Sequence, residues 1–113
     1  MSESISRRNY RDIAPIVSGQ PDSAEIPLAG VAGGLFLIPA DWDGGASVSF
    51  KMAATPGGTF GTLKDKTNAT VSITVTAGCW YPFPPELVQG GAAKIVAASN
   101  PAANRTITWV AKG

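Results

Sequence analysis

An apolar residue at every second position is the sequence feature that most constrains the fold of this chain. This period runs through residues 46–52, 69–76 and 105–111. Successive side chains of a β-strand point to opposite faces, so each segment predicts a strand with one buried face. The residues predicted to point inward are Val48, Phe50, Met52, Val71, Ile73, Val75, Ile107, Trp109 and Ala111.

Turn-forming residues separate these segments from other short apolar runs at spacings of roughly ten residues. The run 34–39 is continuously apolar, which predicts a strand buried on both faces. Only 84–88, which begins with proline and is followed by glycines, suggests a single helical turn. The pattern predicts an all-β, antiparallel sandwich or barrel of seven to eight short strands. The other expected strands are 13–17, 24–28, 58–63 and 93–99.

With 113 residues, the chain is long enough for one ordinary domain. Residues 1–12 are polar and contribute little to a core, so we expect an extended N-terminal arm followed by a β-sandwich domain at 13–113. The arm carries Arg7, Arg8 and Arg11, which favour contact with an acidic partner surface.

The composition argues against several functional classes. Histidine, the commonest general base and transition-metal ligand, is absent, so we expect no enzyme activity, no metal and no cofactor. A net charge of +1 argues against nucleic-acid binding. The sequence shows neither a secretory signal nor an apolar run long enough to span a bilayer, so we expect synthesis in a cytoplasm. The single cysteine, Cys79, is expected to be a buried structural thiol.

The motif Asp41-Trp42-Asp43 resembles the start of a calcium loop. A loop of the EF-hand type would need a bidentate Glu at its twelfth position, which is occupied by Met52. The motif could instead bind a sugar, with Trp42 stacking on the ring and the carboxylates accepting from its hydroxyls. The alternative is that Trp42 covers one end of the sandwich.

Trp80 and Tyr81 lie in the aromatic and proline-rich segment "CWYPFPP". With Trp42, they are the candidate residues for a ligand-binding or interface surface. The alternative reading is a structural corner.

The segment "ATPGGTF" predicts a hairpin turn after the strand 46–52. Pro56 would set the first corner of the turn, and Gly57 or Gly58 would adopt a positive φ. Phe60 would then return to the core.

The order of these features resembles a family of small virion proteins of tailed bacteriophages. The resemblance covers most of residues 26–111, and it departs from the family at 54–57 and in the segment "CWYPFPPEL". The positions that carry it are Pro39, Trp42, Phe50, Gly57, Gly58, Phe60, Leu63 and Arg105.

The resemblance implies a jelly-roll-like β-sandwich and a place on the outer capsid surface, as a decoration or cement protein. The implied partners are the major capsid protein and further copies of the chain, with a trimer favoured. The alternative is a tail, neck or fibre component that binds a host-surface glycan through Trp42 or Trp80.

Overall fold

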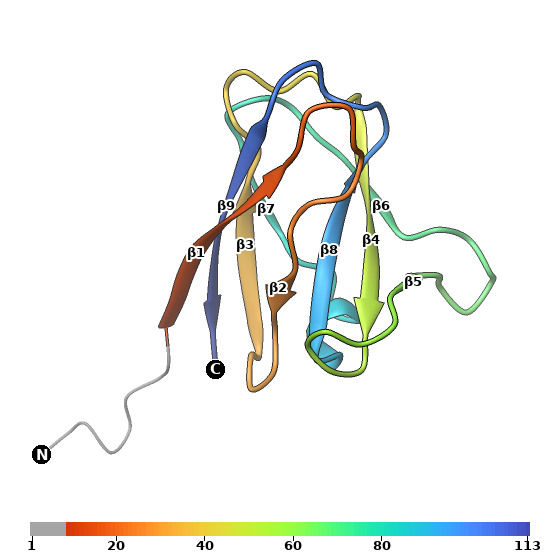
Figure 1. The fold of residues 1–113 in the computed structure, drawn as a ribbon. Helices are drawn as coiled ribbons and strands as arrows, with labels where there is room; N and C mark the ends of the chain where they lie inside the picture. Colours follow the sequence, from red (N-terminus) through yellow and green to blue (C-terminus); the bar gives the residue numbers. More distant parts are fainter. Residues whose placement is uncertain (1–8) are drawn as a thin grey trace, which may run out of the picture.

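The computed structural model describes residues 9–113, which form two antiparallel β-sheets packed face to face (Figure 1). The four-stranded sheet has the order β1-β9-β3-β7. In the five-stranded sheet, β2 pairs with β8, β8 with β4, and β4 with both β5 and β6. The strands are β1 Asn9–Ile16, β2 Ile26–Pro27, β3 Gly33–Leu37, β4 Ser47–Ala53, β5 Gly61–Thr62, β6 Ser72–Thr74, β7 Trp80–Pro82, β8 Ala92–Ala97 and β9 Arg105–Lys112.

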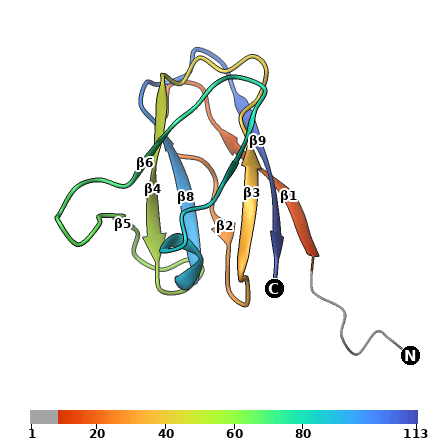
Figure 2. The same cartoon turned by 180° about the vertical axis from the view of Figure 1, so that it is seen from behind.

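The chain passes repeatedly from one sheet to the other. β1, β3, β7 and β9 lie in one sheet, while β2, β8 and the run from β4 to β6 lie in the other (Figures 1 and 2). This arrangement confirms the expected all-β, antiparallel sandwich. The predicted helical segment contributes one 3-10 turn, Leu87–Gln89.

Aromatic side chains from both sheets form the centre of the core. Phe36 of β3 packs edge-on against Phe50 of β4, with ring centroids 5.9 Å apart. Phe36 also lies 5.4 Å from Phe83 and 5.9 Å from Tyr81, between ring centroids. Trp109 of β9 is buried as its alternating pattern predicts.

The predicted hairpin after the strand 46–52 is present. Lys51 pairs with Thr62 across β4 and β5, and the connecting turn places Gly57 at φ 75°. Phe60, however, does not return to the core. It is half-buried under Lys94, whose Nζ lies 4.7 Å from the ring centroid.

Two other expectations about burial are wrong. Leu35, in the continuous apolar run of β3, is 42% exposed, because only one face of the four-stranded sheet is covered by the other sheet. Cys79 is exposed, because it lies in the turn that precedes β7 and not in a strand facing the core.

The expected boundary between arm and domain also shifts. Residues 9–12 belong to β1, which pairs with β9 along its whole length from Asn9–Lys112 to Ile16–Arg105. The ladder hydrogen bonds make this segment part of the sheet. The other residues of the expected arm, 1–8, lie outside the described part of the chain.

Replacing Phe36 with alanine should reduce the free energy of unfolding by about 3–5 kcal/mol, because it removes the ring shared by three aromatic contacts in the core. Leu35→Ala, one position along the same strand, is the control and should cost about 1 kcal/mol or less. Urea unfolding of both variants measures the difference, and similar losses would contradict the assigned core.

Candidate functional site

The outward face of the four-stranded sheet exposes large apolar side chains. Ile13 is 56% exposed, Leu35 42% and Trp80 47%. They come from three different strands, β1, β3 and β7. Solvent-exposed sheet faces are normally polar, so a group of apolar side chains on one face indicates a contact surface.

Strand register brings these residues into rows across the sheet. One row runs from Ile13 of β1 through Thr108 of β9 and Leu37 of β3 to Trp80 of β7. The next row lies two residues along each strand, and therefore on the same face. It consists of Arg11, Val110, Leu35 and Pro82. We call the outward residues of these two rows the apolar face.

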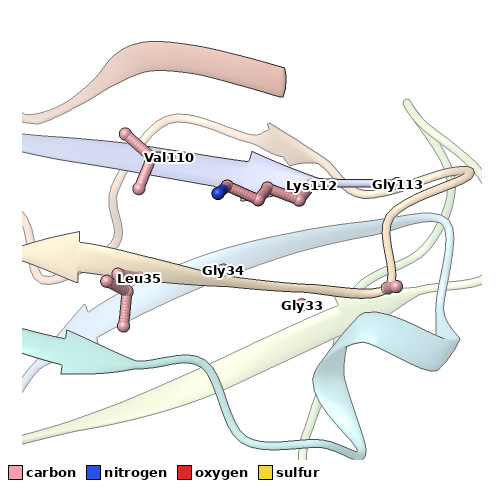
Figure 3. Close-up of a pocket in the computed structure, with 7 residues that line it drawn as sticks. Gly33, Gly34, Leu35, Val110, Lys112 and Gly113 are labelled. Atoms are coloured by element: carbon pink, nitrogen blue, oxygen red, sulfur yellow. The ribbon is translucent and has the colours of Figure 1, made fainter. Parts of the chain in front are cut away.

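A shallow hollow of about 390 Å³ lies at one end of the apolar face (Figure 3). Its lining includes Leu35, Val110 and Lys112, together with the glycines at 33 and 34. A Cβ atom built at Gly33 would meet no heavy atom within 4 Å. Glycine at this position therefore keeps the surface open beside the Lys112 side chain.

The outward face of the five-stranded sheet has a different chemistry. In β4, Ser47, Ser49 and Lys51 alternate with buried residues. The Nζ of Lys51 lies 2.8 Å from a carboxylate oxygen of Asp22, and both side chains are partly exposed. The outward side chains of β4 are therefore polar, and Lys51 is paired within the chain.

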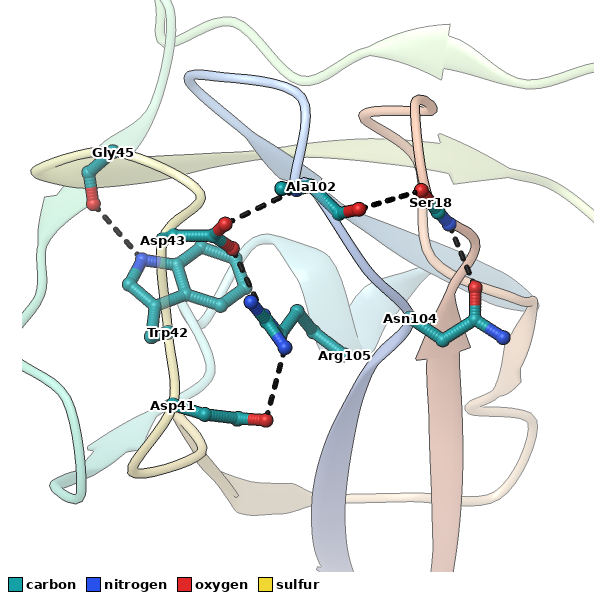
Figure 4. Close-up of polar contacts among 8 residues, drawn as sticks. All are labelled: Ser18, Asp41, Trp42, Asp43, Gly45, Ala102, Asn104 and Arg105. Carbon is teal, nitrogen blue, oxygen red and sulfur yellow. Dashed lines mark hydrogen bonds and ion pairs between the residues drawn. The ribbon is translucent and has the colours of Figure 1, made fainter.

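The Asp41-Trp42-Asp43 motif lies at one end of the sandwich, where it holds Arg105 (Figure 4). Arg105 Nε donates to Asp43 Oδ1 at 2.9 Å, and Nη1 donates to Asp41 Oδ2 at 3.0 Å. Asp43 also accepts from the backbone N–H of Ala102 at 3.1 Å. The guanidinium and this N–H lower the pKa of Asp43 below its ordinary value of 3.8.

Further hydrogen bonds tie the neighbouring loops to this cluster. Ser18 donates through its hydroxyl to the Ala102 carbonyl, and its backbone N–H donates to the side chain of Asn104 (Figure 4). Trp42 Nε1 donates to the Gly45 carbonyl at 2.9 Å. We call Asp41, Asp43 and Arg105 the loop clamp, since they join the β3–β4 and β8–β9 connections.

The clamp engages groups that a sugar would also contact. Both carboxylates and the indole N–H already have partners within the chain. The Trp42 ring packs against the core, and a Cβ at Gly44 would overlap it. Trp42 therefore closes one end of the sandwich, as the structural alternative describes.

The remaining predicted site residues are divided between surfaces. Trp80 lies on the apolar face, whereas the half-buried Tyr81 packs against the core. The Tyr81 hydroxyl accepts from the Thr76 N–H at 2.7 Å in an exposed hydrogen bond. Arg11 lies in a row of the apolar face. Arg7 and Arg8 fall outside the described residues.

The sequence analysis does not predict that Asp41 and Asp43 bind Arg105. Arg105 follows Asp43 by 62 positions and Asp41 by 64, so no local pattern links them. The sequence predicts strands at Ile13 and Leu35 but does not indicate that either side chain faces outward. For Ile13 the sequence carries no usable signal, because the exposed Ile13 and the buried Ile16 are the same residue type on opposite faces of β1.

Within residues 9–113, no three side chains of His, Cys, Asp or Glu come together as a possible metal site. The same part of the chain contains no helix long and apolar enough to cross a membrane.

No protein-family model matches the chain, and no curated protein matches it. Among solved structures, the fold is similar to that of the SPBc2 prophage-derived protein YomS, with a TM-score of 0.62. The match covers 96% of each chain at 11% sequence identity. At this identity the similarity shows a shared fold.

The loop clamp should make stability depend on pH in the acid range. Folding lowers the pKa of Asp43 below its ordinary value of 3.8. The ionised carboxylate therefore contributes fully to the free energy of unfolding above that value, and this contribution is lost as the pH falls through the lower pKa of the folded state. Asp43→Asn should therefore lower Tm at neutral pH. The difference in Tm between wild type and this variant should become smaller below about pH 4.

Thermal unfolding of both proteins between neutral pH and about pH 2 measures this difference. The pKa of Asp65 is also lowered, mainly by hydrogen bonds from Thr67 and Ala69, but this effect is common to both proteins. A difference in Tm that is constant with pH would contradict a charged Asp43–Arg105 pair.

Proposed function

We propose that this chain is a structural protein of a bacteriophage particle, most specifically a decoration or cement subunit that binds the outer capsid surface. The observation that carries the proposal is the exposed apolar face of the four-stranded sheet. Large apolar side chains exposed together on a small domain are typical of a surface that binds another protein.

Two similarities support the link to a phage. The order of motifs from residue 26 to 111 resembles small virion proteins of tailed phages. The similar fold of YomS belongs to a protein described as prophage-derived. From these two similarities the proposal infers that the chain functions in the virion.

The composition supports a subunit that is partly covered by its neighbours. Only 15% of the residues are charged, and a buried charge needs a partner or a costly desolvation. In this proposal the major capsid protein is the principal partner, and copies of the chain associate on the shell, with a trimer favoured. The chain is made in the host cytoplasm and functions in the virion.

Purified protein should bind undecorated heads of the encoding phage until the sites are saturated. Because the protein should bind the intact shell and not the dissociated subunits, it should raise the melting temperature of the heads by mass action. Calorimetry of heads with and without the protein measures the shift. Unchanged melting at saturating protein would contradict a cement role.

The number of copies per particle separates the capsid from the tail. Repetition of the capsid lattice predicts hundreds of copies, whereas a neck, tail or fibre would hold about a dozen or fewer. Quantitative mass spectrometry of purified virions, calibrated on the major capsid protein, gives this number.

One observation favours the second candidate, a glycan-binding tail, neck or fibre component. Trp80 exposes 47% of its surface on a sheet face, where its ring could stack on a sugar. A glycan array tests this candidate with wild type and Trp80→Ala. The capsid proposal predicts that wild type binds no glycan on the array. Glycan binding that is lost in Trp80→Ala would contradict the capsid proposal and favour the tail, neck or fibre component.

A further inference from the structure

We propose that the apolar face docks flat onto a protein surface that has an apolar centre bordered by carboxylates. This inference rests on the proposed function, in which that surface belongs to the capsid shell. It adds which side of the domain makes the contact and what chemistry the partner presents there.

The apolar centre of the partner is inferred from the two rows on the four-stranded sheet. Ile13 and Trp80 lie at the two ends of one row, on the edge strands β1 and β7. Leu35 lies in the other row, on β3 between β9 and β7. The exposed apolar side chains therefore extend across the full width of the sheet, which suits a broad, flat contact.

The carboxylates are inferred from the charges on the same face. Arg11 ends one row, and Lys112 lies two residues beyond Val110 on β9, beside the hollow (Figure 3). Among the described outward positions of β1, β3, β7 and β9, none carries a carboxylate. The exposed Asp12 follows Arg11, but it pairs with the inward-facing Trp109 and so lies on the other side of β1. Two cations with no carboxylate among the described outward positions are complementary to an acidic partner.

The polar face of the five-stranded sheet gives a contrast within the molecule. There Lys51 pairs with Asp22, and Lys94 lies over the ring of Phe60. These cations have partners in the chain, whereas the apolar face offers its two cations outward. This asymmetry identifies the side that meets the partner.

The edge of β1 is poorly suited to the other common mode of docking, strand addition. Pro15 has no N–H to donate, and its carbonyl accepts from the backbone N–H of Ala24 at 2.9 Å. The N–H of Ile13 donates to the Asp12 carboxylate at 2.8 Å. These groups are typical of an edge protected from pairing, so the face and not the edge makes the contact.

A second copy of the chain is a less complementary occupant. If two copies stacked their apolar faces with strands in the same direction, the strand order would be reversed in the partner, so Arg11 would lie over Pro82 of β7 and Lys112 over Gly33 of β3. If the strands ran in opposite directions, these cations would lie over the Pro15 and Thr106 end of the sheet. Neither arrangement places carboxylates of the four strands opposite them.

The test compares charge variants of the two faces in binding to undecorated heads of the encoding phage. Leu35→Glu places a carboxylate in the apolar face, and Ser72→Glu places one at an exposed position of β6 in the other sheet. Leu35→Glu should weaken binding at least tenfold, equivalent to about 1.4 kcal/mol, and Ser72→Glu should bind like wild type. Thermal unfolding checks that both variants fold.

Arg11→Glu is the second variant, chosen because an exposed residue on an edge strand can change charge without disturbing the core. It should also weaken binding to the heads. Arg11→Gln should bind with a smaller dependence on salt than wild type, since one ion pair across the interface is lost.

The outcomes separate the inference from the proposed function. Wild type that does not bind heads at all would overturn the function itself. Wild type that binds, together with Leu35→Glu and Arg11→Glu variants that bind equally well, would leave the function standing and overturn the docking face. Equal losses in Leu35→Glu and Ser72→Glu would also overturn it.

Analytical ultracentrifugation of the purified chain tests the second-copy alternative directly. The sedimentation coefficient of Leu35→Glu should equal that of wild type at every concentration. A wild-type oligomer that dissociates in Leu35→Glu would show that the face is covered by another copy, and would overturn the inference.

Discussion

The two-residue period of β9 is the constraint on which the rest of the molecule depends. β9 lies between β1 and β3, so its register aligns three of the four strands of its sheet. Its inward positions, including Trp109, form part of the core, while Thr108 and Val110 point the other way. A slip of one residue would exchange the two sets, so the core and the apolar face are specified together.

The loop clamp shows why a motif with two carboxylates and a tryptophan need not be a chemical site. Arg105 begins β9 and reaches Asp41 and Asp43 in the connection that follows β3. The side chain of Arg105 is 16% exposed, while those of Asp41 and Asp43 are 63% and 38% exposed, so the clamp is open to solvent on its carboxylate side. The same groups that could bind a metal or sugar instead hold two loops at one end of the sandwich.

Much of the fold was predictable because a strand with one buried face shows in the sequence as an alternation of apolar and polar residues. The segments 46–52 and 105–111 became β4 and β9 with the expected inward residues. The continuous run in β3 was less informative, since an apolar residue such as Leu35 fits a buried position or an interface equally well. Cys79 was misjudged because its neighbour Trp80 suggested burial, whereas both residues are exposed.

The sequence by itself determined the all-β class, the hairpin at Gly57 and the inward residues of β4 and β9, because these depend on local alternation and turn chemistry. Only the tertiary structure decided the partners of Asp41 and Asp43, and which outward residues share a surface. Ile13, Leu35 and Trp80 lie on separate strands far apart in the chain. The sheet order brings them together, because long-range strand pairing depends on the packing of the whole domain.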